Sequence, residues 1–286
     1  MQIILTSLAI IIRIITNSLT GVFQKKLTLK KETPAIVNFN NYFILAFISL
    51  ITLFFIPKPE LKDGFFIFAI LGGITGAICN YFMVEALKYG KLSILGPINS
   101  YKAIVGMIFA IFLLGEFPNI LGLIGVVLII LGSYFIFDTL NFLEIFKKKE
   151  VRYRFYALIF SAIEAVFIKK VILLSSVPIS VIVSFILGAF FSYLILAKDK
   201  IKPIKTPQKS VLIFYILSAL SFGLMTITTA YVFKHIDVAY ALSLFQLSVI
   251  LNIILGWKIF REKDILKKLI GAFIIITGAI IIIFNS

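Results

Sequence analysis

Two long apolar runs, residues 92–114 and 120–137, constrain the fold of this chain more than any other feature. Only a polar corner, Gly115-Glu116-Phe117-Pro118-Asn119, separates them, and Lys102 is the only charge in either run. A helix needs ~20 apolar residues to cross a hydrocarbon core of ~30 Å. The two runs approach or exceed that length, so they predict two membrane helices joined by a tight hinge. A similar unit recurs at 231–284, with its corner at residues 260–263.

The composition places the rest of the chain in the same class. Hydrophobic residues make up 61% of it, charged residues only 14%, and the mean hydropathy is +1.10. Apolar runs separated by short polar loops predict an all-α, multi-pass membrane protein, because helices satisfy their own backbone groups in lipid. The single cysteine, Cys79, excludes an internal disulfide. The net charge of +15 lies almost wholly in loops, which favours headgroup contact and topology over nucleic-acid binding.

We predict ten transmembrane helices. Their approximate bounds are 3–24, 35–56, 64–87, 92–114, 120–137, 153–168, 179–197, 211–233, 238–257 and 269–284. Prolines mark most helix ends, whereas Pro97 follows Gly96 inside the fourth helix and should bend it. The first run, interrupted by Arg13 and Asn17, is interpreted as a retained membrane helix and not as a signal peptide.

An internal repeat divides these helices into two sets of five. Residues 21–26 align with 165–170 at an offset of 144 residues (169 − 25), and Pro34 aligns with Pro178. Glu116, Gly125 and Gly132 align with Glu262, Gly271 and Gly278 at an offset of 146 (262 − 116). The predicted halves are 1–138 and 153–286, joined by a basic connecting loop at 139–152. Because five is odd, the second half enters the membrane in the opposite direction, an inverted repeat typical of secondary transporters.

The chain resembles EamA-type members of the drug/metabolite transporter superfamily over nearly its whole length. The resemblance is carried by residues 85–90, 113–116, 125 and 132 in the first half, and by 239–242, 260–262, 271 and 278 in the second. It implies a ten-helix transporter of small metabolites. The family usually has a proline about thirteen positions before each corner glutamate. Ala103 and Val249 occupy those positions here, and Pro97 is the only proline nearby.

Four charged residues, Arg13, Glu85, Lys102 and Glu164, fall within or near predicted helices. A charge at mid-bilayer costs ~2.5–3.5 kcal/mol on insertion scales, so each should face a cavity or a partner. Lys102 either lines the central cavity and attracts a carboxylate substrate, or forms an ion pair with Glu164 or Glu85. In a third interpretation the site excludes water, and Lys102 competes there with a coupling ion.

Glu164 and Glu85 are the candidates for ion coupling. A carboxylate held out of water is a common proton-coupling group, but Glu164 could equally be a fixed countercharge for Lys102 or Arg13. Glu85 lies three residues before Lys88 and is more typical of a solvated helix end. Arg13 could either line the cavity or form a structural pair.

Further polar residues could bind substrate or join helices. The substrate-binding candidates are Lys102, Tyr101, Asn99, Gln246, Asn17 and Arg13. Gln246 falls opposite Ser100 at the offset of 146, which would place the two across the pseudo-two-fold axis. The alternative for the amide side chains is hydrogen bonding between helices.

The corner glutamates and four glycines are predicted to be structural. Glu116 and Glu262 each precede a helix start, where a carboxylate can accept unpaired amide N–H groups. Gly125 with Gly132, and Gly271 with Gly278, permit close helix approach. That approach should be within the chain, and a homodimer through helices five and ten is the alternative.

The orientation in the membrane is left open by two conflicting arguments. The loops after helices one, three, five, seven and nine hold nearly all the lysine and arginine, which predicts that side to be cytoplasmic with both termini outside. The family resemblance implies both termini inside.

The function that fits these observations is secondary active transport of a small metabolite, with an amino acid or other small carboxylate favoured, across the cytoplasmic membrane. The alternatives are export of a drug or hydrophobic metabolite, and a non-transporting membrane scaffold. An enzyme is disfavoured, since the only histidine, His235, cannot build a histidine-rich zinc site. We expect no cofactor, no metal and no nucleic-acid partner. The expected partners are the substrate, the lipid bilayer and a proton or other coupling ion.

Overall fold

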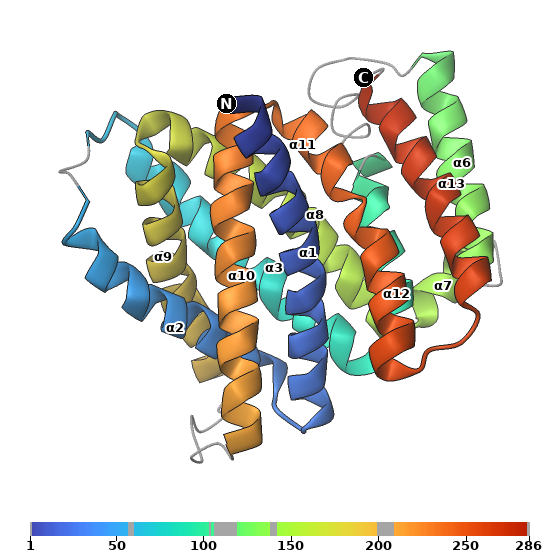
Figure 1. Ribbon diagram of the computed structural model, residues 1–286, viewed down its shortest axis with the longest axis horizontal. Helices are drawn as coiled ribbons and strands as arrows, with labels where there is room; N and C mark the ends of the chain where they lie inside the picture. The colour runs from blue at the N-terminus through green and yellow to red at the C-terminus, as the bar shows by residue number, and fades with distance from the viewer. Residues whose placement is uncertain are drawn as a thin grey trace.

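The structure is a computed structural model that describes residues 2–56, 60–102, 104–105, 119–137, 142–198 and 209–284, and every regular element in these ranges is helical (Figure 1). The elements are α1 (Gln2–Leu29), α2 (Pro34–Leu53), α3 (Phe65–Tyr89), α4 (Leu92–Ile98), η1 (Asn99–Tyr101), α6 (Ile120–Phe137), α7 (Phe142–Lys147), α8 (Lys149–Leu174), α9 (Val177–Lys198), α10 (Lys209–His235), α11 (Val238–Phe245), α12 (Ser248–Phe260) and α13 (Ile265–Phe284).

Eight helical segments among the described residues are long and apolar enough to cross a bilayer. They are α1, α2, α3, α6, α9, α10, α13 and Ala241–Phe260, which spans most of α11 and all of α12. Two predicted helices are not among them. The fourth, 92–114, is described only in its first part, and the sixth, 153–168, lies within the charged 26-residue helix α8. The predicted connecting loop 139–152 contains α7 and the first turn of α8. The chain is a multi-pass membrane protein.

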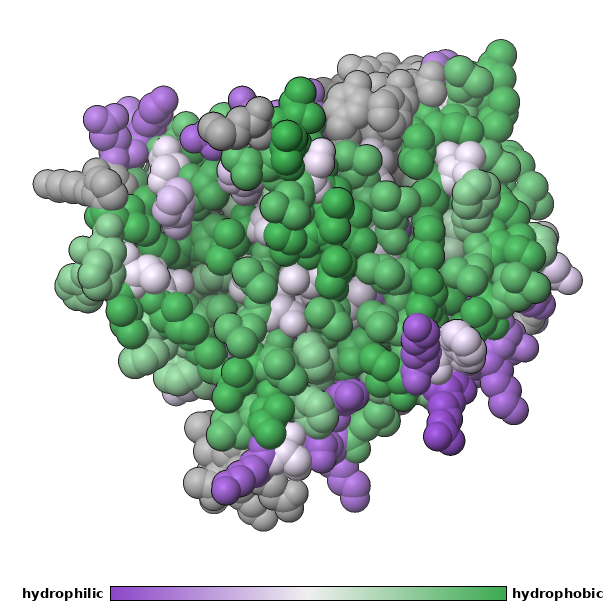
Figure 2. Space-filling model, viewed as in Figure 1, coloured by the Kyte–Doolittle hydropathy of each residue, from purple (hydrophilic) through white to green (hydrophobic). Residues whose placement is uncertain are grey.

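The outer surface has the polarity of a lipid-embedded protein. Figure 2 shows a broad apolar belt with hydrophilic residues gathered toward its upper and lower margins. Large apolar side chains point outward in this belt, including Phe47 (62% exposed), Phe66 (68%) and Phe273 (70%). In water such a surface would be strongly unfavourable, whereas lipid tails solvate it.

Positive charge lies mainly on one edge of the bundle. Both termini lie at the upper edge in Figure 1, and α1, α3, α9 and α12 all end at the opposite edge. Each of these four helices carries a lysine in its last turn: Lys26, Lys88, Lys198 and Lys258. A cation there stabilises the negative end of the helix dipole.

Helix pairs from the two halves form the bundle. α1 packs along α10, α3 along α8, α2 along α9, and α4 against α12. Small residues allow several of these approaches. A β-carbon added at Gly73 would lie 2.6 Å from Cβ of Leu187 on α9, and one at Gly223 would lie 2.7 Å from Leu45 on α2. Close approach at small residues is how membrane helices gain packing energy without a hydrophobic driving force.

The α6–α13 pair uses the four glycines singled out in the sequence, and each of them faces the backbone of the other helix. A β-carbon at Gly125 would lie 2.6 Å from the carbonyl oxygen of Gly278, and the reverse distance is also 2.6 Å. Gly132 and Gly271 face each other in the same way, at 2.8 and 2.7 Å. The glycine faces of the two helices therefore contact each other within one chain.

Two helices are interrupted at positions that the repeat makes equivalent. α4 contains Pro97 and passes into the 3₁₀ turn η1, and α11 is separated from α12 at Gln246 and Leu247. No proline lies in residues 238–260. The second break is instead built from amides that donate to the carbonyl three residues earlier, among them Gln246 to Ser243 at 3.1 Å and Val249 to Gln246 at 2.9 Å. The bend at the second break thus forms without the proline that the family resemblance implied.

The glycine pair gives a prediction about stability. Gly278→Val should lower the melting temperature of the detergent-purified protein, because its side chain would meet the Gly125 carbonyl, and overpacking costs ~1–3 kcal/mol. Gly72→Val is the control, since the nearest atom to a β-carbon there is 3.6 Å away. Equal melting temperatures for the two variants would contradict the close packing.

Candidate functional site

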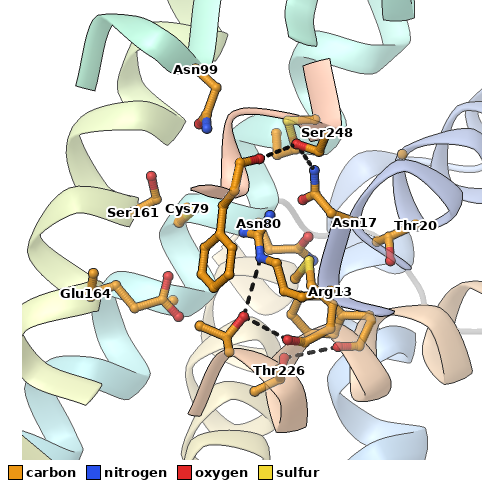
Figure 3. Close-up of a pocket in the computed structure, with 18 of the residues that line it drawn as sticks. Arg13, Asn17, Thr20, Cys79, Asn80, Asn99, Ser161, Glu164, Thr226 and Ser248 are labelled. Atoms are coloured by element: carbon orange, nitrogen blue, oxygen red, sulfur yellow. Dashed lines mark hydrogen bonds between the residues drawn. The ribbon is translucent and has the colours of Figure 1, made fainter. Parts of the chain in front are cut away.

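A central cavity lies between the two halves of the bundle. Its wall takes residues from α1, α2, α3, α4, α8, α9, α10, α11 and α12, together with Asn99 and Lys102 around η1. Its volume is ≈ 170 Å³, against the ~10–15 Å³ that one water molecule needs. The space suits a small polar molecule. Figure 3 shows side chains from both halves of the chain converging on it.

Arg13 projects into the cavity from α1 with part of its hydrogen-bonding capacity unused. Its Nε donates to the hydroxyl of Thr229 on α10 at 3.4 Å, and its guanidinium lies 4.1 Å from the ring centroid of Phe245. The Nη1 atom is buried and has no hydrogen-bond partner in the described part of the chain. A buried, unpaired guanidinium N–H is costly unless a ligand or water accepts it. Arg13 is therefore placed to bind an anionic or strongly accepting group.

Lys102 and Glu164 also line the cavity, from η1 and α8. No ion pair joins them, although they lie within electrostatic reach of each other. The countercharge interpretation of Glu164, and the ion-pair interpretation of Lys102, thus lack a direct contact in this structure. A β-carbon added at Gly76 on α3 would lie 2.5 Å from Glu164 Oε1, so the carboxylate packs directly against the α3 backbone.

Arg154 is a further charged residue of the cavity wall, and it stabilises the break after α4. Its Nε donates to the carbonyl of Leu95 at 3.0 Å and its Nη2 donates to Asn99 Oδ1 at 2.9 Å. The amide of Asn99 bonds to Gly96 and Pro97 and not to Leu95, so the Leu95 carbonyl lacks the helical bond from the residue four positions later. Arg154, only 8% exposed, supplies the donor that lipid cannot.

The two helix breaks are joined by hydrogen bonds. Asn99 donates to Gln246 Oε1 at 3.3 Å, and Ser100 donates to the same oxygen at 3.1 Å. Ser100 and Gln246 are equivalent under the 146-residue offset, so the residues expected to face each other are in contact. On the other side, Asn17 of α1 donates to Ser248 Oγ at 3.0 Å, as Figure 3 shows.

A chain of buried amides closes the wall between α1, α2 and α3. Gln24 donates to Asn80 at 2.9 Å, Asn80 donates to Asn38 at 2.7 Å, and Asn38 donates to the carbonyl of Ala77 at 3.1 Å. Each member is paired within the chain, which makes this network a helix-to-helix connection. Asn80 and Gln24 also border the cavity.

Four of the six predicted substrate-binding residues, Arg13, Asn17, Asn99 and Lys102, line the cavity, and so does Glu164. The structure places the other predicted residues elsewhere. Tyr101 turns toward α6, where its hydroxyl contacts Ser133. Gln246 is 1% exposed and bonded behind the cavity wall. Glu85 lies near the end of α3, where it accepts from Tyr81 at 3.2 Å.

Glu262 caps a different helix from the one it precedes. Its two carboxylate oxygens accept from the amides of Leu92 at 2.8 Å and Ser93 at 3.0 Å, at the start of α4 in the other half. The Ser93 hydroxyl also contacts the carboxylate, and Lys268 donates to that hydroxyl at 2.9 Å. Long-range packing, which sequence spacing does not reveal, decides which amides are capped. The equivalent residue, Glu116, lies outside the described residues.

Sequence reasoning did not single out Arg154, which lies at the start of the predicted sixth helix, 153–168, next to the basic loop. The signal was the helical register. Arg154, Ser161 and Ile168 are spaced by seven residues and share the face of α8 that carries Glu164. Residues seven apart lie almost two full turns apart on one side of a helix. Among the described residues, no cluster of three His, Cys, Asp or Glu side chains could hold a metal ion.

The role of Arg154 predicts a contrast with its neighbour Arg152. Arg154→Met should destabilise the protein by about 1–3 kcal/mol, because it leaves the buried Leu95 carbonyl without a donor. Arg152→Met removes the same charge from an exposed position of the same helix turn and should change stability little. Thermal unfolding of both variants in detergent tests this, and equal losses would contradict the role given to Arg154.

Comparisons with known proteins identify the family. Residues 4–138 and 151–284 each match the EamA-like transporter family. The chain is 23% identical over 259 residues to "Putative sugar uptake protein YxfA" of Lactococcus lactis subsp. lactis (strain IL1403), covering 83% of this chain and 85% of that protein. A solved crystal structure shares the fold, with a TM-score of 0.65 at 15% identity over 96% of this chain and 95% of that one. Because both matches to the family together span most of its length, the chain belongs to the EamA-like transporter family.

Proposed function

We propose that the chain is a secondary active transporter that carries a small metabolite with a carboxylate group, an amino acid or other small carboxylate, across the cytoplasmic membrane. The observation that carries this proposal is the charge of the cavity wall. Three cationic side chains, Arg13, Lys102 and Arg154, face one carboxylate, Glu164, among the described lining residues. Cations are expensive at this depth, so an anionic occupant that offsets them is the simplest reason for their presence.

Alternating access between two inverted five-helix repeats is the mechanism we propose. Equivalent residues of the two halves make equivalent contacts, which supports the repeat. Lys25 on α1 donates to the carbonyls of Gly90 and Leu87 at the end of α3. Lys169 on α8 donates to those of Phe233 and Ile236 at the end of α10. Phe233 and Ile236 are Leu87 and Gly90 shifted by 146 residues.

The break after α4 and the break between α11 and α12 support the same mechanism. Interrupted helices that meet at the centre of a repeat protein commonly form the binding site of transporters, since their freed backbone groups and side chains can contact the substrate. Here both breaks lie at the cavity, with Asn99 at one and Ser248 at the other. Two similar halves of opposite orientation can exchange conformations with little change in energy.

A neutral sugar is the second candidate substrate. The relative from Lactococcus lactis is described as a sugar uptake protein. The cavity wall carries Asn17, Asn80 and Asn252, together with the rings of Phe222 and Phe233, and amides with aromatic faces suit a polyol. A neutral sugar, however, offers Arg13 and Lys102 no anionic partner. Hydrophobic cargo and a scaffold role leave them without one as well.

The substrate proposal predicts which of two matched ligands will bind. D-glucuronate should raise the melting temperature of the detergent-purified protein more than D-glucose, because the two differ by a carboxylate that Arg13 and Lys102 can bind. A ligand at 100 times its dissociation constant stabilises by about 2.7 kcal/mol. Lactate and alanine extend the test to a smaller anion and a zwitterion.

Two lysine variants provide the internal control. Lys102→Ala should lose the response to glucuronate, whereas Lys88→Ala, at an exposed position outside the cavity, should keep it. Stabilisation by glucose as strong as by glucuronate, unchanged in Lys102→Ala, would favour the sugar and overturn the anion proposal.

We also propose that the basic edge of the bundle faces the cytoplasm, which follows from the excess of lysine and arginine in its loops. In a Cys79→Ser background, Lys26→Cys should be protected from a membrane-impermeant thiol reagent in intact cells, and Lys234→Cys should be labelled. The reverse pattern would support the orientation implied by the family, with both termini inside.

A further inference from the structure

Glu164 is the only carboxylate in the described wall of the cavity, and it shares that wall with the cations proposed to bind the substrate. It projects from α8, and Arg13 reaches the same cavity from α1, as Figure 3 shows. A β-carbon added at Gly76 on α3 would lie 2.5 Å from Glu164 Oε1, so the carboxylate packs against that helix. No hydrogen bond or ion pair holds it among the described residues, so its charge is not fixed by a permanent partner.

The other titratable and charged groups around Glu164 come from every side of the cavity. They are Tyr42 on α2, Cys79 on α3, Lys102 next to η1, Arg13 on α1 and Arg154 on α8 itself. Lys102 is within electrostatic reach of Glu164, Arg13 and Arg154. Arg154 is bound to Leu95 and Asn99. Lys102 and Arg13 are therefore the cations that an ionised Glu164 and a substrate anion would share.

An ionised Glu164 and a bound anion repel each other in a site of low dielectric constant. A proton on Glu164 removes that repulsion and leaves both cations available to the substrate. By linkage, if protonation raises the affinity for the anion, the anion raises the affinity for the proton by the same factor. The two ligands bind cooperatively and not in competition.

We propose that Glu164 is a proton-binding site, and that the transporter carries its anionic substrate together with a proton in the same direction. The inference rests on the proposed anionic substrate and gives the sign of its coupling. The proton binds the carboxylate from the solution on one side and leaves it on the other, and no covalent bond of the substrate changes. A cationic substrate would instead compete with the proton and produce exchange.

The pH dependence of glucuronate binding tests this coupling. In the parent protein the affinity should fall at least about tenfold between about pH 5 and pH 9, a coupling in the usual range. Glu164→Gln, which mimics the protonated side chain, should bind at the alkaline end as tightly as the parent binds at the acidic end. Glu60→Gln, at an exposed position, should keep the parent profile. A parent and a Glu164→Gln variant with the same pH profile would overturn the coupling and leave anion transport standing.

A second measurement needs no substrate. Infrared difference spectra of the ligand-free protein should contain the C=O stretch of a protonated carboxyl group that disappears on alkalinisation over the same range and is absent in Glu164→Gln. Its absence in the parent would overturn the proton site even if no tested anion binds.

Alanine provides the last distinction. If the parent binds alanine and Glu164→Gln does not, the carboxylate pairs with the substrate ammonium, and the proton-symport inference is wrong.

Discussion

The need to satisfy every backbone carbonyl without water is the constraint on which the cavity depends. One break follows α4 and the other separates α11 from α12, both in the middle of the bundle. Each break frees polar groups that lipid cannot bond. Arg154 bonds the carbonyl freed at Leu95, and Asn99, Ser100 and Gln246 tie the first break to the second. Asn17 and Ser18 bond the second break from α1 through Ser248. Many of the polar groups that line the cavity among the described residues are thereby paired, whereas Arg13 keeps an unpaired N–H group and Glu164 has no hydrogen-bond partner there.

This arrangement separates residues that build the cavity from residues free to bind within it. Arg154, Asn99 and Gln246 are hydrogen-bonded to other groups of the chain, whereas Arg13 keeps an unused N–H group and Lys102 has no ion pair with Glu164. A charged group in a membrane is costly either way. A charged side chain that is paired within the chain stabilises the fold. A charged side chain without such a partner forms a site at which ligand binding lowers the free energy. The functional proposals rest on this difference and not on the number of polar residues.

The sequence was sufficient to predict the class of fold and to single out three of the four charged residues in the described cavity wall. Apolar run lengths predict membrane helices because the bilayer has one thickness, and intramembrane charges such as Arg13, Lys102 and Glu164 predict a cavity because lipid does not tolerate them. Tyr101 and Gln246 were misplaced because they are close to the breaks, where the direction of a side chain depends on the local turn. Arg154 was not singled out because α8 starts four residues earlier than expected, which places this residue one turn inside the helix and not at its end. The partner of Glu262 could not be predicted, since it belongs to the opposite half.

The glycine seam between α6 and α13 has a consequence for how such a protein can change. No residue of either helix lies in the described cavity wall, and the four glycine positions on their shared face leave no room for a β-carbon. We therefore expect α6 and α13 to stay packed together, while the residues proposed to bind the substrate lie on the other elements. A chain redesigned for a new substrate would be changed on α1, α3, α8 and α10 and kept unchanged on α6 and α13. Labels attached to the exposed faces of α6 and α13 would therefore lie away from the cavity.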